Sequence, residues 1–220
     1  MFKKLIQNLR SGERKPAAFD PSCFGDPIAM RTGWTPAKSG GTHFRTHKLV
    51  AVDADRLEFQ LATQAKVFFL PFLLIGIGVP LISLYSKISS GSLEFDLEAI
   101  GLLVFTAVFL LLGMWVFLFF SKPIVFDKRK GLFWKGRREP DRAVVKNPQH
   151  KFAELNSIHA LQLLSERCEG EDSTYLSYEL NIVLDNGERI NVIDHGNQDK
   201  LREDAQAVSA FLGKPVWDAT

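Results

Sequence analysis

Two long apolar segments interrupt an otherwise polar sequence. Residues 67–86 and residues 99–121 contain no Lys, Arg, Asp, Glu or His. About 20 apolar helical residues cross a bilayer core, and buried helices of soluble proteins rarely exclude charge over this length. The pattern therefore predicts a transmembrane hairpin over residues 65–121, with residues 87–98 as its outer loop. The absence of ionisable residues in either span argues against an ion or proton path.

Outside the spans, apolar and polar residues alternate with a period of two, which predicts antiparallel strands. Two predicted hairpins flank the spans, and a further strand and a third hairpin follow. Asn186-Gly187 predicts a tight type I′ turn in the last hairpin. The seven predicted strands are His47–Val52, Leu57–Leu61, Pro123–Asp127, Leu132–Lys135, Ile158–Leu164, Tyr178–Leu184 and Arg189–Asp194.

Helical spacing appears at the end of the chain and predicts a helix over residues 198–212. Asn197 is a suitable N-cap, and Gly213 ends the pattern. Seven antiparallel strands followed by one helix is the element order of a pleckstrin-homology-like (PH-like) domain. We therefore predict an α+β membrane protein. Its two-helix transmembrane hairpin is inserted into a seven-stranded antiparallel PH-like β-domain with a C-terminal helix.

The insertion divides the predicted domain into two pieces. Residues 46–64 form its first hairpin, and residues 122–220 form the remainder. Residues 1–45 precede it as an irregular arm, in which residues 1–10 have the spacing of an amphipathic helix. That helix suits either the membrane surface or packing against the domain.

The average composition conceals this organisation, because 46% hydrophobic and 24% charged residues are typical of a soluble domain. Residues 1–66 carry 11 basic and 6 acidic side chains, whereas the loop at 87–98 carries one Lys and three acids. Residues 122–142 are again rich in Lys and Arg. The positive-inside rule therefore places both termini in the cytoplasm and the loop outside.

Three segments resemble uncharacterised bacterial inner-membrane proteins. They are Gly40–His47 (GGTHFRTH), Leu180–Gly196 (LNIVLDNGERINVIDHG) and Phe211–Asp218 (FLGKPVWD). The likeness covers about residues 34 to 218. It implies a PH-like domain tethered to the bacterial inner (cytoplasmic) membrane, and it brings neither an activity nor a catalytic residue.

A basic cluster follows the second span and is the candidate contact site for anionic lipid or for a protein partner. Its residues are Lys122, Lys128, Arg129, Lys130, Lys135, Arg137 and Arg138. Anionic lipid attracts such charges, but the simpler interpretation, which we prefer, is that they only set the topology. Nucleic acid is not expected, because residues 143–220 carry 7 basic and 13 acidic side chains.

Catalytic chemistry has one candidate, Asp194-His195, at a strand-to-helix junction. A membrane-bound hydrolase using this pair is the alternative function. The pair also suits a turn that caps the helix, and the sequence has no G-x-S-x-G motif. Cys23 and Cys168 are isolated from each other, so we expect neither a metal nor another cofactor. The prediction is a non-enzymatic binding, scaffold or regulatory protein, such as an immunity or accessory subunit, with a protein partner or a second copy.

Overall fold

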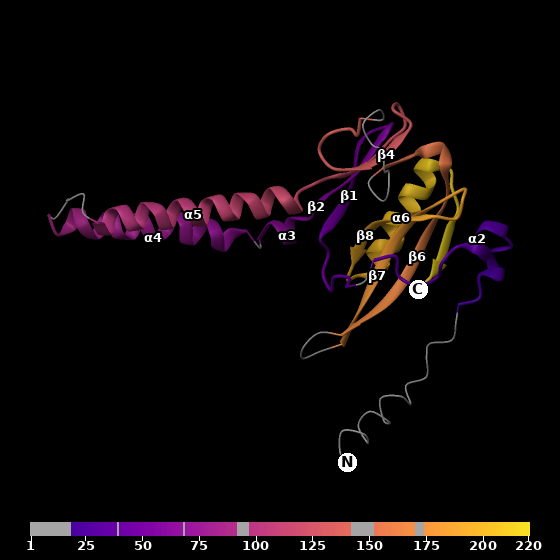
Figure 1. The fold of residues 1–220 in the computed structure, drawn as a ribbon, viewed down its shortest axis with the longest axis horizontal. Coiled ribbons are helices and arrows are strands. Elements are labelled where there is room, and N and C mark those ends of the chain that lie inside the picture. Colours follow the sequence, from indigo (N-terminus) through magenta and orange to yellow (C-terminus); the bar gives the residue numbers. More distant parts are fainter. Residues whose placement is uncertain (1–18, 39, 68, 92–96, 142–151, 170–173) are drawn as a thin grey trace, which may run out of the picture.

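A long helical hairpin projects from a β-domain in this protein (Figure 1). The computed structural model describes residues 19–38, 40–67, 69–91, 97–141, 152–169 and 174–220. The architecture is α+β, with mainly antiparallel sheets and two long apolar helices, as the sequence pattern predicted. The amphipathic helix predicted for residues 1–10 lies outside the described residues.

The first sheet has five antiparallel strands in the order β1-β2-β3-β4-β5. Strands β2 and β3 pair directly, from Arg56↔Asp127 to Phe59↔Ile124. The segments before and after the two long helices therefore belong to one sheet. The strands are β1 (His47–Asp53), β2 (Arg56–Leu61), β3 (Ile124–Asp127), β4 (Leu132–Lys135) and β5 (Phe152–Glu154).

The second sheet has four strands in the order β8-β7-β6-β9, and its last strand is parallel to β6. A short 3-10 helix, η2 (Leu155–Ser157), connects it to the first sheet. The strands are β6 (Ile158–Glu169), β7 (Thr174–Leu184), β8 (Arg189–His195) and β9 (Val216–Ala219).

The described chain thus has two strands more than the seven predicted, β5 and β9. Neither forms a tight hairpin with its partner strand, so a local pattern of two strands joined by a turn does not reveal them. Each forms because a longer strand offers its edge. Ala153 pairs with Phe133 of β4, and Trp217 pairs with Gln162 of β6.

Helix α6 (Gln198–Leu212) has the predicted bounds and closes the core between the sheets. Asn197 caps it, because Oδ1 accepts from the Lys200 amide at 2.9 Å. Gly213 ends it in the left-handed region, with φ of 68°. Leu201, Ala205 and Val208 pack with Leu180 and Ile182 of β7, so the predicted helical and strand faces meet in one core.

The turn between β7 and β8 differs from the type I′ prediction, which was wrong. Leu184 rather than Asp185 pairs with Glu188, because the Leu184 amide donates to Glu188 O at 2.8 Å. The Gly187 amide also donates to Leu184 O at 2.8 Å, so the loop has three residues. Gly187 has a φ of 84° and takes the left-handed position of this longer loop.

Contacts from outside the hairpin explain this longer loop. The Asp185 amide donates to Ser157 O at 3.0 Å, and the Arg31 guanidinium donates to Asp185 O at 2.8 Å. Both backbone groups of Asp185 are therefore engaged away from β8. Tertiary contacts override the local preference of Asn-Gly for a two-residue turn.

The N-terminal arm, residues 19–46, lies across the outer face of the second sheet. It contains η1 (Pro21–Phe24) and α2 (Pro27–Arg31). Ala29 is fully buried against Ala160 and Trp217, and Trp34 stacks with Phe24. Each of the two faces of the second sheet is therefore covered, one by the core and one by the arm.

The projecting hairpin consists of α4 (Leu70–Ser89) and α5 (Leu97–Phe120), preceded by the short helix α3 (Thr63–Val67). Both long helices are long and apolar enough to cross a membrane. Glycines allow the two helices to pack closely, because a Cβ on Gly113 would lie 2.8 Å from Phe72 Cβ. A Cβ on Gly76 would similarly lie 2.8 Å from Leu110 Cδ2.

Candidate functional site

The structure divides the predicted basic cluster between the two ends of the β3–β4 hairpin. Ile124 pairs with Lys135 at the end next to α5, and Asp127 pairs with Leu132 beside the turn. Three residues of strand separate these pairs by roughly 10 Å. The turn at 128–131 therefore points away from the long helices, and the seven basic residues do not form one surface.

The three cations of the turn are engaged within the protein. Their ionic and ring contacts hold the turn to neighbouring elements, which leaves them less available for a ligand. The pairs are Lys128 with the Phe211 ring, at 4.4 Å, Arg129 with Asp53, and Lys130 with Glu139.

Lys135 joins the two sheets. Its Nζ lies 3.3 Å from Asn191 Oδ1 on β8. Burial lowers the pKa of Lys135 to about 8, and the Lys38 charge acts in the same direction. The side chain therefore belongs to the polar contacts between the two sheets, inside the β-domain.

The remaining predicted cations, Lys122, Arg137 and Arg138, are exposed. Lys122 Nζ lies 4.7 Å from the centre of the Phe119 ring, and Arg137 donates to Ser121 Oγ at 2.5 Å. Lys122 and Arg137 therefore contact the end of α5 and the residue that follows it.

Lys66 joins Arg137 in one groove, although the predicted cluster omitted it. A groove of about 370 Å³ is lined by both residues, together with Glu58, Ser121 and the apolar residue Phe117. We call it the polar groove after its charged side chains. Lys66 comes before the first span and Arg137 after the second, and the β2–β3 pairing brings them together. The signal in the sequence was the position of Lys66 directly before an apolar run.

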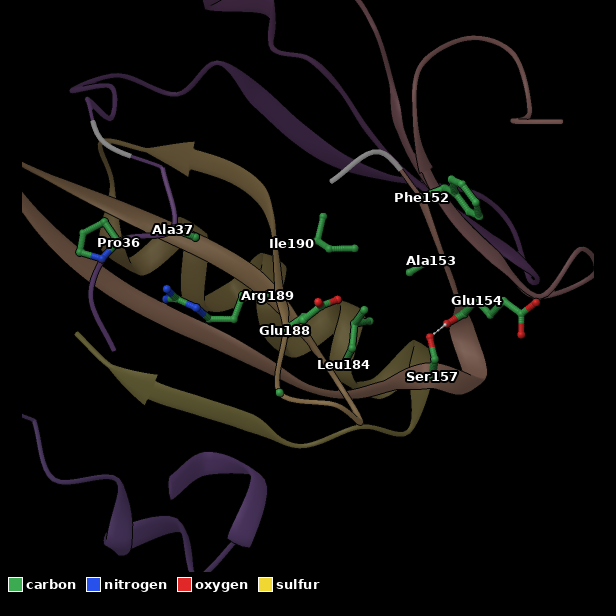
Figure 2. Close-up of a pocket in the computed structure, with 11 residues that line it drawn as sticks. Pro36, Ala37, Phe152, Ala153, Glu154, Ser157, Leu184, Glu188, Arg189 and Ile190 are labelled. Atoms are coloured by element: carbon green, nitrogen blue, oxygen red, sulfur yellow. Dashed lines mark hydrogen bonds between the residues drawn. The ribbon is translucent and has the colours of Figure 1, made fainter. Parts of the chain in front are cut away.

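A second hollow of about 650 Å³ lies between the terminal strands of the two sheets, β5 and β8 (Figure 2). Glu154 and Ser157 line one side, and Glu188 and Arg189 line the other. Arg189 Nη1 donates to Thr35 O of the arm at 2.6 Å. Among the described residues, β8 pairs with β7 and otherwise makes only one isolated bridge, at its end.

The Asp194-His195 pair has the geometry of a turn rather than of a proton relay. His195 is fully buried, and its Nδ1 accepts from the Asn197 amide at 2.9 Å. Burial lowers the pKa of His195 to about 4, and the nearby Arg45 charge acts in the same direction. Asp194 instead accepts from Asn191 Nδ2 at 3.0 Å. No hydroxyl or thiol of the described chain hydrogen-bonds to the His195 ring.

The acidic side chain opposite Asp194 is Glu179 on β7, and sequence reasoning did not select it. It is only 2% exposed, and burial raises its pKa. Its carboxylate accepts from the Ala37 amide at 2.9 and 3.1 Å, which ties the arm to the sheet. These hydrogen bonds give the buried Glu179 carboxylate a structural role, which is to hold the arm against the sheet.

The described part of the chain holds no group of three or more His, Cys, Asp or Glu side chains placed to bind a metal. Comparison with family models, curated proteins and solved structures finds no match to this chain.

Proposed function

We propose that this chain is a non-enzymatic, membrane-anchored binding protein of the bacterial inner membrane. In this proposal α4 and α5 cross the bilayer, both termini are cytoplasmic, and the β-domain receives a protein partner. One observation carries it: the helices leave from β2 and return to β3, which are paired neighbours. A partner bound to the β-domain would therefore be held close to the membrane.

The exposure of the helices supports the membrane part of the proposal. Leu74, Ile82 and Leu111 are between 62% and 71% exposed, and they represent many apolar side chains on the outer faces of α4 and α5. Covering a large aliphatic side chain that is otherwise in water stabilises a protein by about 1.5–3 kcal/mol. Lipid tails provide that cover over the full length of both helices.

The arrangement of the β-domain supports a PH-like assignment. Strands β1–β4 form one sheet, β6–β8 belong to the other, and α6 packs into the core between them. This is the element order of a PH-like domain, to which β5 and β9 are additions. Regulatory or accessory subunits, including immunity proteins, are specific forms of the binding function that we propose.

The hollow between β5 and β8 is the partner site that we propose. Terminal strands present unpaired backbone donors and acceptors, to which an extended segment of another protein can add as a new strand. Glu188 and Arg189 place charges of both signs beside that edge. The proposed occupant is therefore an extended, polar segment of a membrane or cytoplasmic protein.

Cysteine labelling tests the topology. Cys23 is exposed on the β-domain, whereas Cys168 is buried. In intact cells, a membrane-impermeant maleimide should leave wild-type Cys23 unlabelled until the membrane is permeabilised. The matched variant combines Cys23→Ser with Ser90→Cys, which moves the reporter to the loop end of α4, and it should label at once. Labelling of wild-type Cys23 in intact cells would overturn the topology.

Site-specific crosslinking in the native membrane tests the partner site. A photoreactive amino acid is placed at Glu188, which lines the hollow, or at Gln206, which is exposed on α6. A discrete adduct from position 188 that is absent from position 206 supports the proposal. Equal adducts at both positions, or a chain recovered without any partner, would count against it.

A further inference from the structure

A polar groove and an apolar groove meet where the helical hairpin joins the β-domain. The apolar groove, of about 580 Å³, lies between α4 and α5, and Lys66 and Phe117 line it as well as the polar groove. The combined surface therefore begins at charged groups and continues along the long helices.

The polar end carries two cations without a carboxylate partner among the described residues, Lys66 and Arg137. Glu58 lies in the same groove, but neighbouring side chains already pair with both of its carboxylate oxygens. The Arg56 guanidinium lies 2.6 Å from one Glu58 oxygen, and Gln60 Nε2 donates to the other at 2.9 Å. The groove therefore favours an anion.

The apolar end favours a hydrocarbon chain over any other occupant. Its aromatic and aliphatic walls run along helices whose outer faces are themselves apolar. Phe72 and Gly113 both line it, at the point where the Phe72 side chain packs directly against α5. Lys66 and Ser121 flank the ends of the two long helices, at the depth where phospholipid headgroups lie when such helices span a bilayer.

We propose that this junction binds one anionic phospholipid. Its phosphate lies between Lys66 and Arg137, and one acyl chain occupies the groove between α4 and α5. This inference rests on the proposed membrane insertion of the helices, but it is independent of the protein partner. It differs from the predicted basic cluster, because the cations of the β3–β4 turn take no part.

Native mass spectrometry of the full chain in detergent tests the proposal with two lipids, phosphatidylglycerol and phosphatidylcholine. The wild type should retain phosphatidylglycerol preferentially. Because each cation near anionic lipid adds about fivefold to affinity, Lys66→Gln with Arg137→Gln should lower its retention about 25-fold. Lys128→Gln with Arg129→Gln, an equal charge change at the exposed β3–β4 turn, should retain the lipid as the wild type does.

A second variant tests the acyl-chain groove without altering charge. Met114→Trp places a bulky ring in the groove and should reduce the retention of both lipids severalfold. Glycerol phosphate, which has the phosphate but no chain, should not displace the bound lipid. Displacement by glycerol phosphate, equal retention of the two lipids, or wild-type behaviour of the double variant would overturn the proposal.

Alkaline extraction of the membranes distinguishes a failure of the lipid-site proposal from a failure of the proposed membrane anchor. A chain released by alkaline carbonate would overturn the membrane anchor and the lipid site together. A chain that stays in the membrane but shows no lipid preference would overturn the lipid site alone.

Discussion

His195 should make the stability of the β-domain depend on pH. It lies at the end of β8 with no exposed surface, and its Nε2 has no hydrogen-bond partner in the described structure. Its Nδ1 already accepts from the Asn197 amide, so the ring is neutral with its proton on Nε2. A second proton would break the bond to Asn197 and add a positive charge near Arg45.

The sign and size of the effect follow from the pKa. Burial lowers the native pKa of His195 to about 4, from 6.5 in the unfolded chain. The unfolded state therefore binds a proton more readily, so this contribution is complete above pH 6.5 and is lost as the pH falls towards 4. Between pH ~7.5 and pH ~5 the loss is about 2 kcal/mol.

The perturbation is His195→Asn. An Asn oxygen can accept from the amide two residues ahead, so the variant keeps the bond to Asn197 while removing the titrating group. Urea unfolding in non-ionic detergent, followed by the fluorescence of the buried residues Trp134 and Trp217, measures the free energy of unfolding. Between pH ~7.5 and pH ~5, the free energy of unfolding of the variant should fall by about 2 kcal/mol less than that of the wild type.

Other groups make a matched comparison necessary. Burial also lowers the pKa of His47, which acts in the same direction, whereas burial raises the pKa of Glu179, which acts in the opposite direction. The difference between variant and wild type isolates His195. His43→Asn, the same change at an exposed histidine, should keep the wild-type pH profile. Parallel profiles for His195→Asn and the wild type would refute the reasoning.

Three further predictions concern packing. Gly196→Ala places a Cβ 2.0 Å from the His43 backbone, so it should cost about 1–3 kcal/mol and speed proteolysis of the arm; an unchanged cleavage rate would contradict this. Gly113→Leu should separate α4 from α5 and lower the thermal stability in detergent, whereas Gly101→Leu, which meets open space, should not. Leu180→Ala removes a fully buried side chain and should cost about 2–5 kcal/mol in urea unfolding, and a loss below 1 kcal/mol would place Leu180 outside the core.

Local patterns were sufficient wherever one element carried its own signal. The spacing from Leu201 to Leu212 and the caps at Asn197 and Gly213 predicted α6 with its observed bounds. Alternation along Tyr178–Leu184 predicted the core face of β7. These features depend on residues within a few positions of each other, so the chain reveals them without a tertiary structure.

Features that depend on distant segments were not predictable. The short strand β9 exists because β6 offers an edge, and the turn after Leu184 is long because Ser157 and Arg31 hold Asp185. The arm appeared irregular because its helices are short, yet it covers a whole face of the second sheet.

The sequence by itself determined two long apolar helices, most of the strands and the terminal helix, because hydrophobic period and length are local properties. Only the tertiary structure decided which charges gather. Strand pairing sends Lys128, Arg129 and Lys130 to the far end of a hairpin and brings Lys66 beside Arg137. Lys66 and Arg137 line one groove although two long helices separate them in the chain. No local sequence pattern reveals that they lie close together.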